Sequence, residues 1–382
     1  MSFSLKKSST LFSFLILLFL TGCGSLSGCM PSEEELRSVS YTPLVQEDWP
    51  VSTPAEQGID SLLLAKLYYK ATRLETTFSL LVIKNGFLIA EDYFNGATTG
   101  QKYNLQSVTK SFTSALVGIA IEQGYLALED KMMNYFPELK DQVRDERKFD
   151  ITIEHLLQMR AGFAWEESSD ELFEILYTGF RPSTILQIPL TADPGTKFQY
   201  SNFSAHLLGI IITRSTGKDL KTFAEQELAY PLGIEIGKWI KDWEAYYLGF
   251  AELHLSARDL AKFALLYLNE EKQDSAQLVS KQWVFDSLQR YSEDAWQYRV
   301  GRNFKDIGYG YQWWSIRADD QFYNLAWGHG GQQIALLEKQ NMVIVLTADP
   351  LRAQHGGGPW RIEKANLNLI ADFIAELSKS AP

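Results

Sequence analysis

Segments with the pattern of β-strands lie toward both ends of this chain. Within residues 77–94, the pair Asn85-Gly86 separates two apolar runs, which predicts a hairpin because both turn positions need a positive φ. Past Gly308, alternating and β-branched residues predict further strands at 309–314, 332–337 and 342–347. We therefore expect the two ends of the chain to share one sheet.

The residues between these strands have the pattern of helices. Apolar side chains at helical spacing predict a buried helix over 108–122, which Gly124 ends. The same spacing predicts helices at 152–159, 202–216, 256–269 and 362–377. Together these patterns predict an α+β fold, with a largely antiparallel sheet flanked by helices and an inserted helix-rich subdomain at about 145–290.

Residues 1–22 have the order of a secretory signal: a basic start, an apolar core over 11–20, and small residues before Cys23. The core is too short to span a bilayer comfortably. Leu20-Thr-Gly-Cys23 resembles the bacterial lipoprotein box, which implies cleavage before Cys23 and a diacylglycerol on its sulfur. Because Gly24 follows the cysteine, we expect an outer membrane location facing the periplasm, or the outer face of the cell membrane in a Gram-positive source.

Residues 23–48 mix Gly, Ser, Pro and Glu without a sustained period. This composition predicts a flexible tether between the membrane and a domain over 49–382. Cys29 is the only other cysteine, so the fold cannot depend on an internal disulfide if Cys23 is acylated.

The acidic balance of the chain limits its partners. Asp and Glu number 47 against 36 Lys and Arg, giving a net charge of −11, and no basic stripe is present, so nucleic acid is excluded as a partner. The histidines show neither the His-Glu-x-x-His spacing nor a Cys/His cluster, so we expect no metal site. Nothing in the sequence implies a cofactor.

The tetrad Ser107-x-x-Lys110 opens the predicted helix over 108–122. A serine hydroxyl is a weak nucleophile near neutral pH, and a lysine one helical turn away is a base that can activate it. At the first turn of a helix, unpaired N–H groups and the helix dipole favour developing negative charge. Ser4 and Ser215 have the same spacing to a lysine, but Ser4 leaves with the signal and Ser215 lies where a helix ends.

Two further motifs follow in chain order. The first is Tyr200-Ser-Asn202, and the second is His329-Gly330-Gly331-Gln332, which runs into the strand predicted at 332–337. Glycines at such a position let a substrate approach a strand whose N–H can stabilise an oxyanion. The similar run at 355–357 precedes no strand and is discounted. Four aromatic residues are candidates for either the cleft or the core: Trp165, Tyr311, Trp313 and Trp314.

Three further sequence segments lie around these motifs, at 124–130, 151–157 and 255–261. Together with the motifs, they form a pattern that resembles the class C β-lactamase-like serine hydrolases. This family also holds penicillin-binding DD-peptidases, family VIII-type esterases and aminohexanoate-oligomer hydrolases. The resemblance extends from about residue 50 to the C-terminus. It implies a β-lactamase/transpeptidase-like fold and a serine hydrolase that cleaves an ester or amide bond in a small-molecule or peptide-like substrate.

The resemblance also implies roles for individual residues. Ser107 would form an acyl-enzyme, and Lys110 would share or withdraw its proton. Tyr200 would relay the proton to the leaving group, and Asn202 would orient Lys110 and the substrate. The N–H groups of Ser107 and Gln332 would form the oxyanion hole.

One motif departs from the family pattern. Where β-lactamases and DD-peptidases carry Lys-Thr-Gly, this chain has His329-Gly330-Gly331. A lysine there holds a substrate carboxylate by a fixed positive charge, whereas histidine is mostly neutral near pH 7. We therefore favour an ester or amide hydrolase. The alternatives are a DD-peptidase or β-lactamase acting on wall peptides or penicillins, and a catalytically silent lipoprotein that binds the cell wall.

Overall fold

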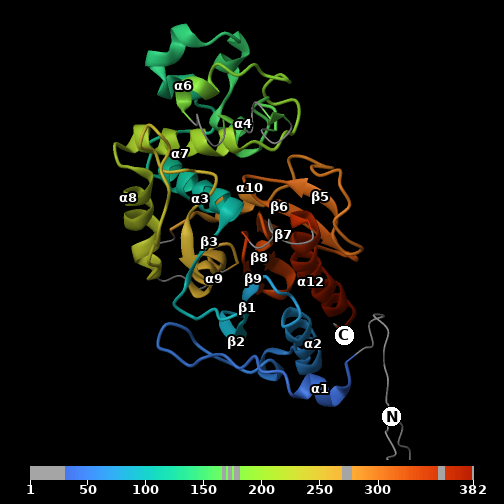
Figure 1. Ribbon diagram of the computed structural model, residues 1–382. Helices are drawn as coiled ribbons and strands as arrows, with labels where there is room; N and C mark the ends of the chain where they lie inside the picture. The colour runs from blue at the N-terminus through green and yellow to red at the C-terminus, as the bar shows by residue number, and fades with distance from the viewer. Residues whose placement is uncertain are drawn as a thin grey trace, which may run out of the picture.

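A seven-stranded antiparallel sheet joins the two ends of the chain (Figure 1). The computed structural model describes residues 31–165, 169–170, 174–175, 181–268, 278–351 and 358–380. The strand order is β2-β1-β9-β8-β7-β6-β5. The strands are β1 (Thr77–Lys84), β2 (Phe87–Tyr93), β5 (Lys305–Tyr309), β6 (Trp314–Ala318), β7 (Gln321–Gly328), β8 (Gln332–Leu337) and β9 (Met342–Ala348). The prediction of an α+β fold with a sheet shared by both chain ends is confirmed.

The predicted hairpin is formed by β1 and β2. At its turn, Asn85 and Gly86 have φ values of 53° and 83°, as an Asn-Gly turn requires. Strand β1 also pairs with β9, the last strand in sequence, which lies inside the sheet with every residue buried. A strand covered on both faces is apolar throughout, which explains the unbroken apolar run in β9.

The C-terminal strands differ from the prediction in one place. The strand predicted over 309–314 is wrong, because β5 ends at Tyr309 and β6 begins at Trp314. Between them Gln312 has a φ of 63°, and its side-chain amide donates hydrogen bonds to the carbonyl oxygens of Leu156 and Leu157. This aromatic segment is therefore a turn anchored on the helical part, and the sequence did not indicate strand β7 that follows β6.

Helices cover both faces of the sheet. Helix α2 (Ser61–Ala71) and α12 (Pro359–Ser380) pack together on one face, and α9 (Ala257–Leu265) contacts β1, β8 and β9 from the other (Figure 1). The buried helix predicted over 108–122 is α3 (Thr109–Glu122), whose side chains from Thr109 to Ala120 are all buried. Burial on every side holds α3 firmly in place.

The other helices surround α3. Helix α7 (Asn202–Thr216) packs against α3 and against α4 (Ile153–Leu157), and a short sheet pairs β3 (Lys102–Asn104) with β4 (His254–Ser256). The other α-helices among the described residues are α1 (Glu33–Arg37), α6 (Pro182–Ile185), α8 (Leu220–Ala224) and α10 (Lys281–Ser287). Shorter turns of helix are η1 (Ala55–Gln57), η2 (Gln106–Val108), η3 (Met132–Tyr135), η4 (Pro137–Gln142), η5 (Glu146–Asp150), η7 (Glu225–Ala229), η8 (Tyr230–Leu232) and η9 (Glu338–Gln340).

The described part of the predicted tether packs onto the domain. Leu36 in α1 is buried, and the buried guanidinium of Arg258 donates hydrogen bonds to Asp48 and to the carbonyl oxygen of Leu44. The prediction of a flexible tether over 23–48 is therefore wrong for the described residues that make these contacts, because Leu36 is buried and residues 44 and 48 satisfy a buried charge. The signal segment and Cys23 lie outside the described residues. Among the residues that are described, no helix has the length and apolar character of a membrane span.

Candidate active site

Ser107 lies in the turn η2, directly before the buried helix α3. One helical turn later, the Lys110 Nζ lies 2.9 Å from the Ser107 Oγ. Lys110 is only 1% exposed, so its amine works in an environment that water does not reach. The sequence prediction that these two side chains face each other agrees with this geometry.

Two further contacts fix the direction of the lysine amine. Lys110 Nζ donates hydrogen bonds to the Asn202 Oδ1 at 2.8 Å and to the carbonyl oxygen of Phe250 at 3.1 Å. Both partners are acceptors that cannot donate. These contacts hold the amine within hydrogen-bond distance of the Ser107 hydroxyl, where a neutral amine can accept its proton.

Helix α7 supplies Asn202 because the helix begins there. Ser201 is its N-cap, and the Ser201 Oγ accepts a hydrogen bond from the Ser204 N–H. Tyr200 precedes the cap, and its ring lies 4.8 Å from the Lys110 Nζ. The Tyr-x-Asn motif therefore delivers a phenol and an amide to the same amine.

Aromatic rings position Tyr200. Its ring stacks on Trp314 at 5.4 Å and meets Tyr309 edge to face at 6.3 Å. Burial raises the pKa of Tyr309 well above its usual value, so Tyr309 is a neutral phenol that packs against Tyr200. The Tyr200 ring thus lies against both the Lys110 amine and the Trp314 ring.

A buried histidine supports the segment that provides the Phe250 carbonyl. Gly249 donates its N–H to the His206 Nδ1 at 3.4 Å, so the ring proton lies on Nε2, which is 2.9 Å from the Asp242 Oδ2. The His206 and Asp242 side chains are both fully buried. Burial lowers the pKa of His206, and the opposing effect of Asp242 is smaller. His206 is therefore neutral, with one nitrogen accepting and the other donating.

The His-Gly-Gly motif forms the turn between β7 and β8. Gly330 and Gly331 have φ values of 79° and 96°. Gly328, the last residue of β7, approaches Leu105 so closely that a Cβ there would lie 2.4 Å from the Leu105 carbonyl oxygen. This contact places the turn beside the segment that carries Ser107.

Gln332 is the first residue of β8 and is buried. Its side-chain amide pairs with the main chain of Ala348, donating to the carbonyl oxygen and accepting from the N–H. The amide is thus anchored between two strands. Any contribution of Gln332 to an oxyanion hole must come from its main chain, as the sequence predicts.

Glu363 on α12 is a site residue that the sequence analysis missed. Its carboxylate accepts hydrogen bonds from the Trp327 Nε1 at 2.7 Å and the Gly330 N–H at 3.0 Å, and it lies 3.0 Å from the His329 Nδ1. The Glu363 side chain is 8% exposed, against 41% for His329. No local motif marks this glutamate, because every one of its partners comes from the distant β7–β8 hairpin.

These residues enclose a small pocket. Its volume is about 110 Å³, and its lining consists of Ser107, Trp165, Tyr200, Trp296, Trp314, Trp327, His329 and Glu363. A groove of about 560 Å³ adjoins it and shares Trp165, Tyr200 and Trp296. Of the aromatic candidates, Trp165 and Trp314 line the pocket, whereas Tyr311 and Trp313 are buried in the core.

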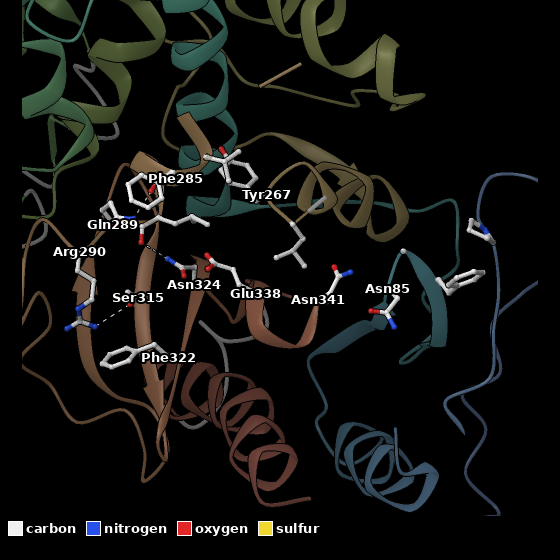
Figure 2. A pocket seen from close by; sticks show the side chains of 16 residues that line it. Asn85, Tyr267, Phe285, Gln289, Arg290, Ser315, Phe322, Asn324, Glu338 and Asn341 are labelled. Atoms are coloured by element: carbon white, nitrogen blue, oxygen red, sulfur yellow. Dashed lines mark hydrogen bonds between the residues drawn. The ribbon is translucent and has the colours of Figure 1, made fainter. Parts of the chain in front are cut away.

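The larger cavity lies elsewhere. It measures about 1180 Å³ and is lined by residues at the β1–β2 and β8–β9 turns and at the end of α10. Figure 2 shows Asn85 and Asn341 from the two turns, with Arg290 and Phe322 on the other side. Strand β8 begins at the turn that carries His329 and ends at the β8–β9 turn. This cavity and Ser107 therefore lie near opposite ends of strand β8.

The duplicate tetrad forms no second site. The Ser215 Oγ donates to the carbonyl oxygen of Ile212 in its own helix, and the Lys218 Nζ contacts Glu227. The other two decoys, Ser4 and His355, lie outside the described residues. Among the described residues, no group of three His, Cys, Asp or Glu side chains could hold a metal ion.

A serine paired with a buried lysine at the start of a helix, beside an antiparallel sheet, is the arrangement of serine hydrolases with a β-lactamase/transpeptidase-like fold. The chain belongs to the Beta-lactamase family, whose model matches residues 72–364, and it is a serine hydrolase of that family.

The chain is also similar to individual proteins. A putative fimbrial assembly protein of Dichelobacter nodosus is 29% identical over 280 residues, covering 68% of this chain and 70% of that protein. A 6-aminohexanoate-dimer hydrolase of Paenarthrobacter ureafaciens is 26% identical over 323 residues, covering 77% of this chain and 79% of that protein. The solved structure of a putative 6-aminohexanoate-dimer hydrolase from Bacillus anthracis has the same fold, with a TM-score of 0.63, 23% identity and 80% of each chain covered.

Proposed function

We propose that Ser107 is the nucleophile of an ester or amide hydrolase that works through an acyl-enzyme. One observation carries this proposal: the buried Lys110 Nζ, held by Asn202 and the Phe250 carbonyl oxygen, lies 2.9 Å from the Ser107 Oγ. A neutral amine held in this way accepts the serine proton as the oxygen attacks a carbonyl carbon.

In acylation, the Ser107 Oγ bonds to the carbonyl carbon while its proton moves to the Lys110 Nζ. The N–H groups of Ser107 and Gln332 stabilise the oxyanion that forms. Tyr200 relays this proton from Lys110 to the leaving group as the bond to that group breaks. Asn202 keeps the lysine amine aimed at the serine throughout.

In deacylation, water attacks the acyl carbon and gives a proton to the same group of side chains. The bond to the Ser107 Oγ then breaks, and the oxygen takes back a proton. Both half-reactions need the amine, the phenol and the hydroxyl close together. The 2.9 Å between the Lys110 Nζ and the Ser107 Oγ, and the 4.8 Å between that amine and the Tyr200 ring, support this proposal.

The pocket favours substrates other than penicillins or wall peptides that end in a carboxylate. The residue in the place of the family lysine is His329, and the neighbouring Glu363 adds a negative charge. A substrate carboxylate would lie near that charge without a fixed cation to bind it. The intact contacts of Ser107, Lys110 and Asn202 also favour an active enzyme over a silent binding protein.

The test is labelling of the purified domain with a fluorophosphonate, read by intact mass. We expect one adduct, which the Ser107→Ala variant loses, and turnover of p-nitrophenyl esters with little turnover of nitrocefin. A wild-type protein that takes no label would overturn the proposal. Nitrocefin turnover with a stable penicilloyl adduct on Ser107 would favour a β-lactamase or DD-peptidase instead.

We propose separately that the protein is a lipoprotein attached through Cys23, facing the periplasm from the outer membrane, or on the outer face of the cell membrane of a Gram-positive cell. The Leu-Thr-Gly-Cys sequence and the apolar core before it support this. A labelled fatty acid should be incorporated into the wild type and not into Cys23→Ser. Release of both proteins into the soluble fraction would contradict it.

A further inference from the structure

The nucleophile's pocket has walls of tryptophan. Four of its lining residues are indoles, and they contact one another: Trp165 and Trp296 at 5.8 Å, Trp296 and Trp327 at 5.3 Å, and Trp314 and Trp327 at 5.4 Å. An aromatic enclosure of this kind binds either apolar groups or cations, because the faces of indole rings carry negative charge. The charged groups near the pocket decide between the two.

Glu363 places a carboxylate in the same pocket. Its two oxygens are engaged by the Trp327 Nε1, the Gly330 N–H and the His329 Nδ1, so the carboxylate is fixed in position. A carboxylate that accepts the N–H of an indole adds electron density to that ring and strengthens its attraction for a cation. Glu363 therefore adds to the attraction of the indoles rather than opposing it.

The cations nearby do not cancel this effect. Lys110 is 1% exposed, is held by Asn202 and Phe250 beneath the serine, and is absent from the described lining of the pocket. His329 pairs with Glu363, so the net charge of this pair is zero when His329 is protonated and negative when it is not. The adjoining groove has Arg160 and Lys197 on its lining together with Glu293 and Asp294, so its formal charges balance.

We propose that this pocket selects esters or amides that carry an ammonium group close to the scissile bond. The inference rests on the proposed function, because the ammonium must bind beside the acyl-enzyme serine. The family lysine would hold a carboxylate there, and here the indoles and Glu363 reverse the charge that the site selects.

The test compares substrates of equal shape and different charge. Acetylthiocholine and its neutral isostere 3,3-dimethylbutyl thioacetate differ only in the quaternary nitrogen. We expect kcat/KM to be at least about tenfold higher for the cationic ester. Tetramethylammonium should inhibit hydrolysis of p-nitrophenyl acetate competitively, whereas tert-butanol and pivalate at equal concentration should not.

Two variants assign the effect to the pocket. Glu363→Gln and Trp296→Leu should each bring the two thioesters to similar kcat/KM values, and the measurement is the ratio of these two values within each variant. The matched controls are Glu376→Gln, a half-buried glutamate on the same helix, and Trp243→Leu, an exposed tryptophan. Both controls should keep the cation preference of the wild type.

The outcomes separate this inference from the proposed function. A wild type that labels at Ser107 but hydrolyses the neutral thioester as well as the cationic one would overturn the cation inference alone. The same holds if tetramethylammonium and tert-butanol inhibit equally. A wild type that takes no label would instead overturn the proposed function.

Discussion

The site has two sides that differ in how they are built. The reaction side consists of two pairs, Ser107 with Lys110 and Tyr200 with Asn202. The two residues of each pair are at most three positions apart and lie where a helix starts. The recognition side consists of His329, Glu363 and the tryptophans. These residues come from the β7–β8 hairpin, the C-terminal helix, the start of β6 and loops far apart in sequence. The reaction side follows the family pattern, and the recognition side departs from it. The chemistry and the choice of substrate can therefore change independently.

The largest expected effect comes from removing the nucleophile. Ser107→Ala should lower kcat/KM for p-nitrophenyl acetate by at least about 10⁴-fold, because no other group on the reaction side can form the acyl-enzyme. Binding of tetramethylammonium should persist, since the recognition side is untouched. Calorimetry on the variant measures that binding. Activity within tenfold of the wild type would show that the two sides have been assigned wrongly.

The next effect concerns the base. Lys110→Met keeps an unbranched side chain but removes the amine that faces the Ser107 Oγ, so kcat should fall by about 10³-fold. Lys218→Met is the matched control, because it changes the lysine of the duplicate tetrad, which contacts Glu227. The control should keep wild-type kcat. A similar loss in both variants would point to a general effect of lysine removal rather than to the reaction side.

The reaction side was predictable from sequence because its geometry is local. A helix places residues three apart on one face, so Ser107-x-x-Lys110 and the start of α7 could be read from spacing alone. The N-terminal segment was not predictable in the same way. Its polar composition indicates a tether, yet Arg258, more than 200 residues later, binds Asp48 and Leu44.

The recognition side could be predicted only in part. His329 and its glycines form a visible motif, but Glu363 reads as one more acidic residue on an amphipathic helix.

The turn at 310–313 was missed for a related reason. Its aromatic residues have strand propensity, but the Gln312 side chain bonds to the last two residues of α4, and the chain turns there. Contacts of this kind depend on tertiary structure, which local patterns do not encode.

A smaller effect is expected from the hairpin that joins the two sides. Gly331→Ala puts a Cβ at a φ of 96° and 2.5 Å from the Asn366 Cβ. We expect about 1–3 kcal/mol less stability. The hairpin should also move enough to lower kcat/KM by about 10²-fold. Gly86→Ala is the control, since it has a φ of 83° but nothing within 4 Å. If both variants lost the same activity, strain rather than displacement would be the cause.

The smallest effect tests the support beneath the reaction side. Because burial lowers the pKa of His206, the folded protein binds fewer protons than the unfolded chain once the pH falls below the ordinary histidine value of 6.5. Stability is then lost as the pH falls. Protonation would also put a hydrogen on the Nδ1 that accepts from Gly249, which disturbs the segment that carries the Phe250 carbonyl. The Tm of the wild type should drop between pH 7.5 and 5.5 by ~2 °C more than that of His206→Asn. His254→Asn leaves this contact intact and should behave as the wild type. If the Tm fell equally between these pH values in all three proteins, His206 would have no role in supporting Lys110.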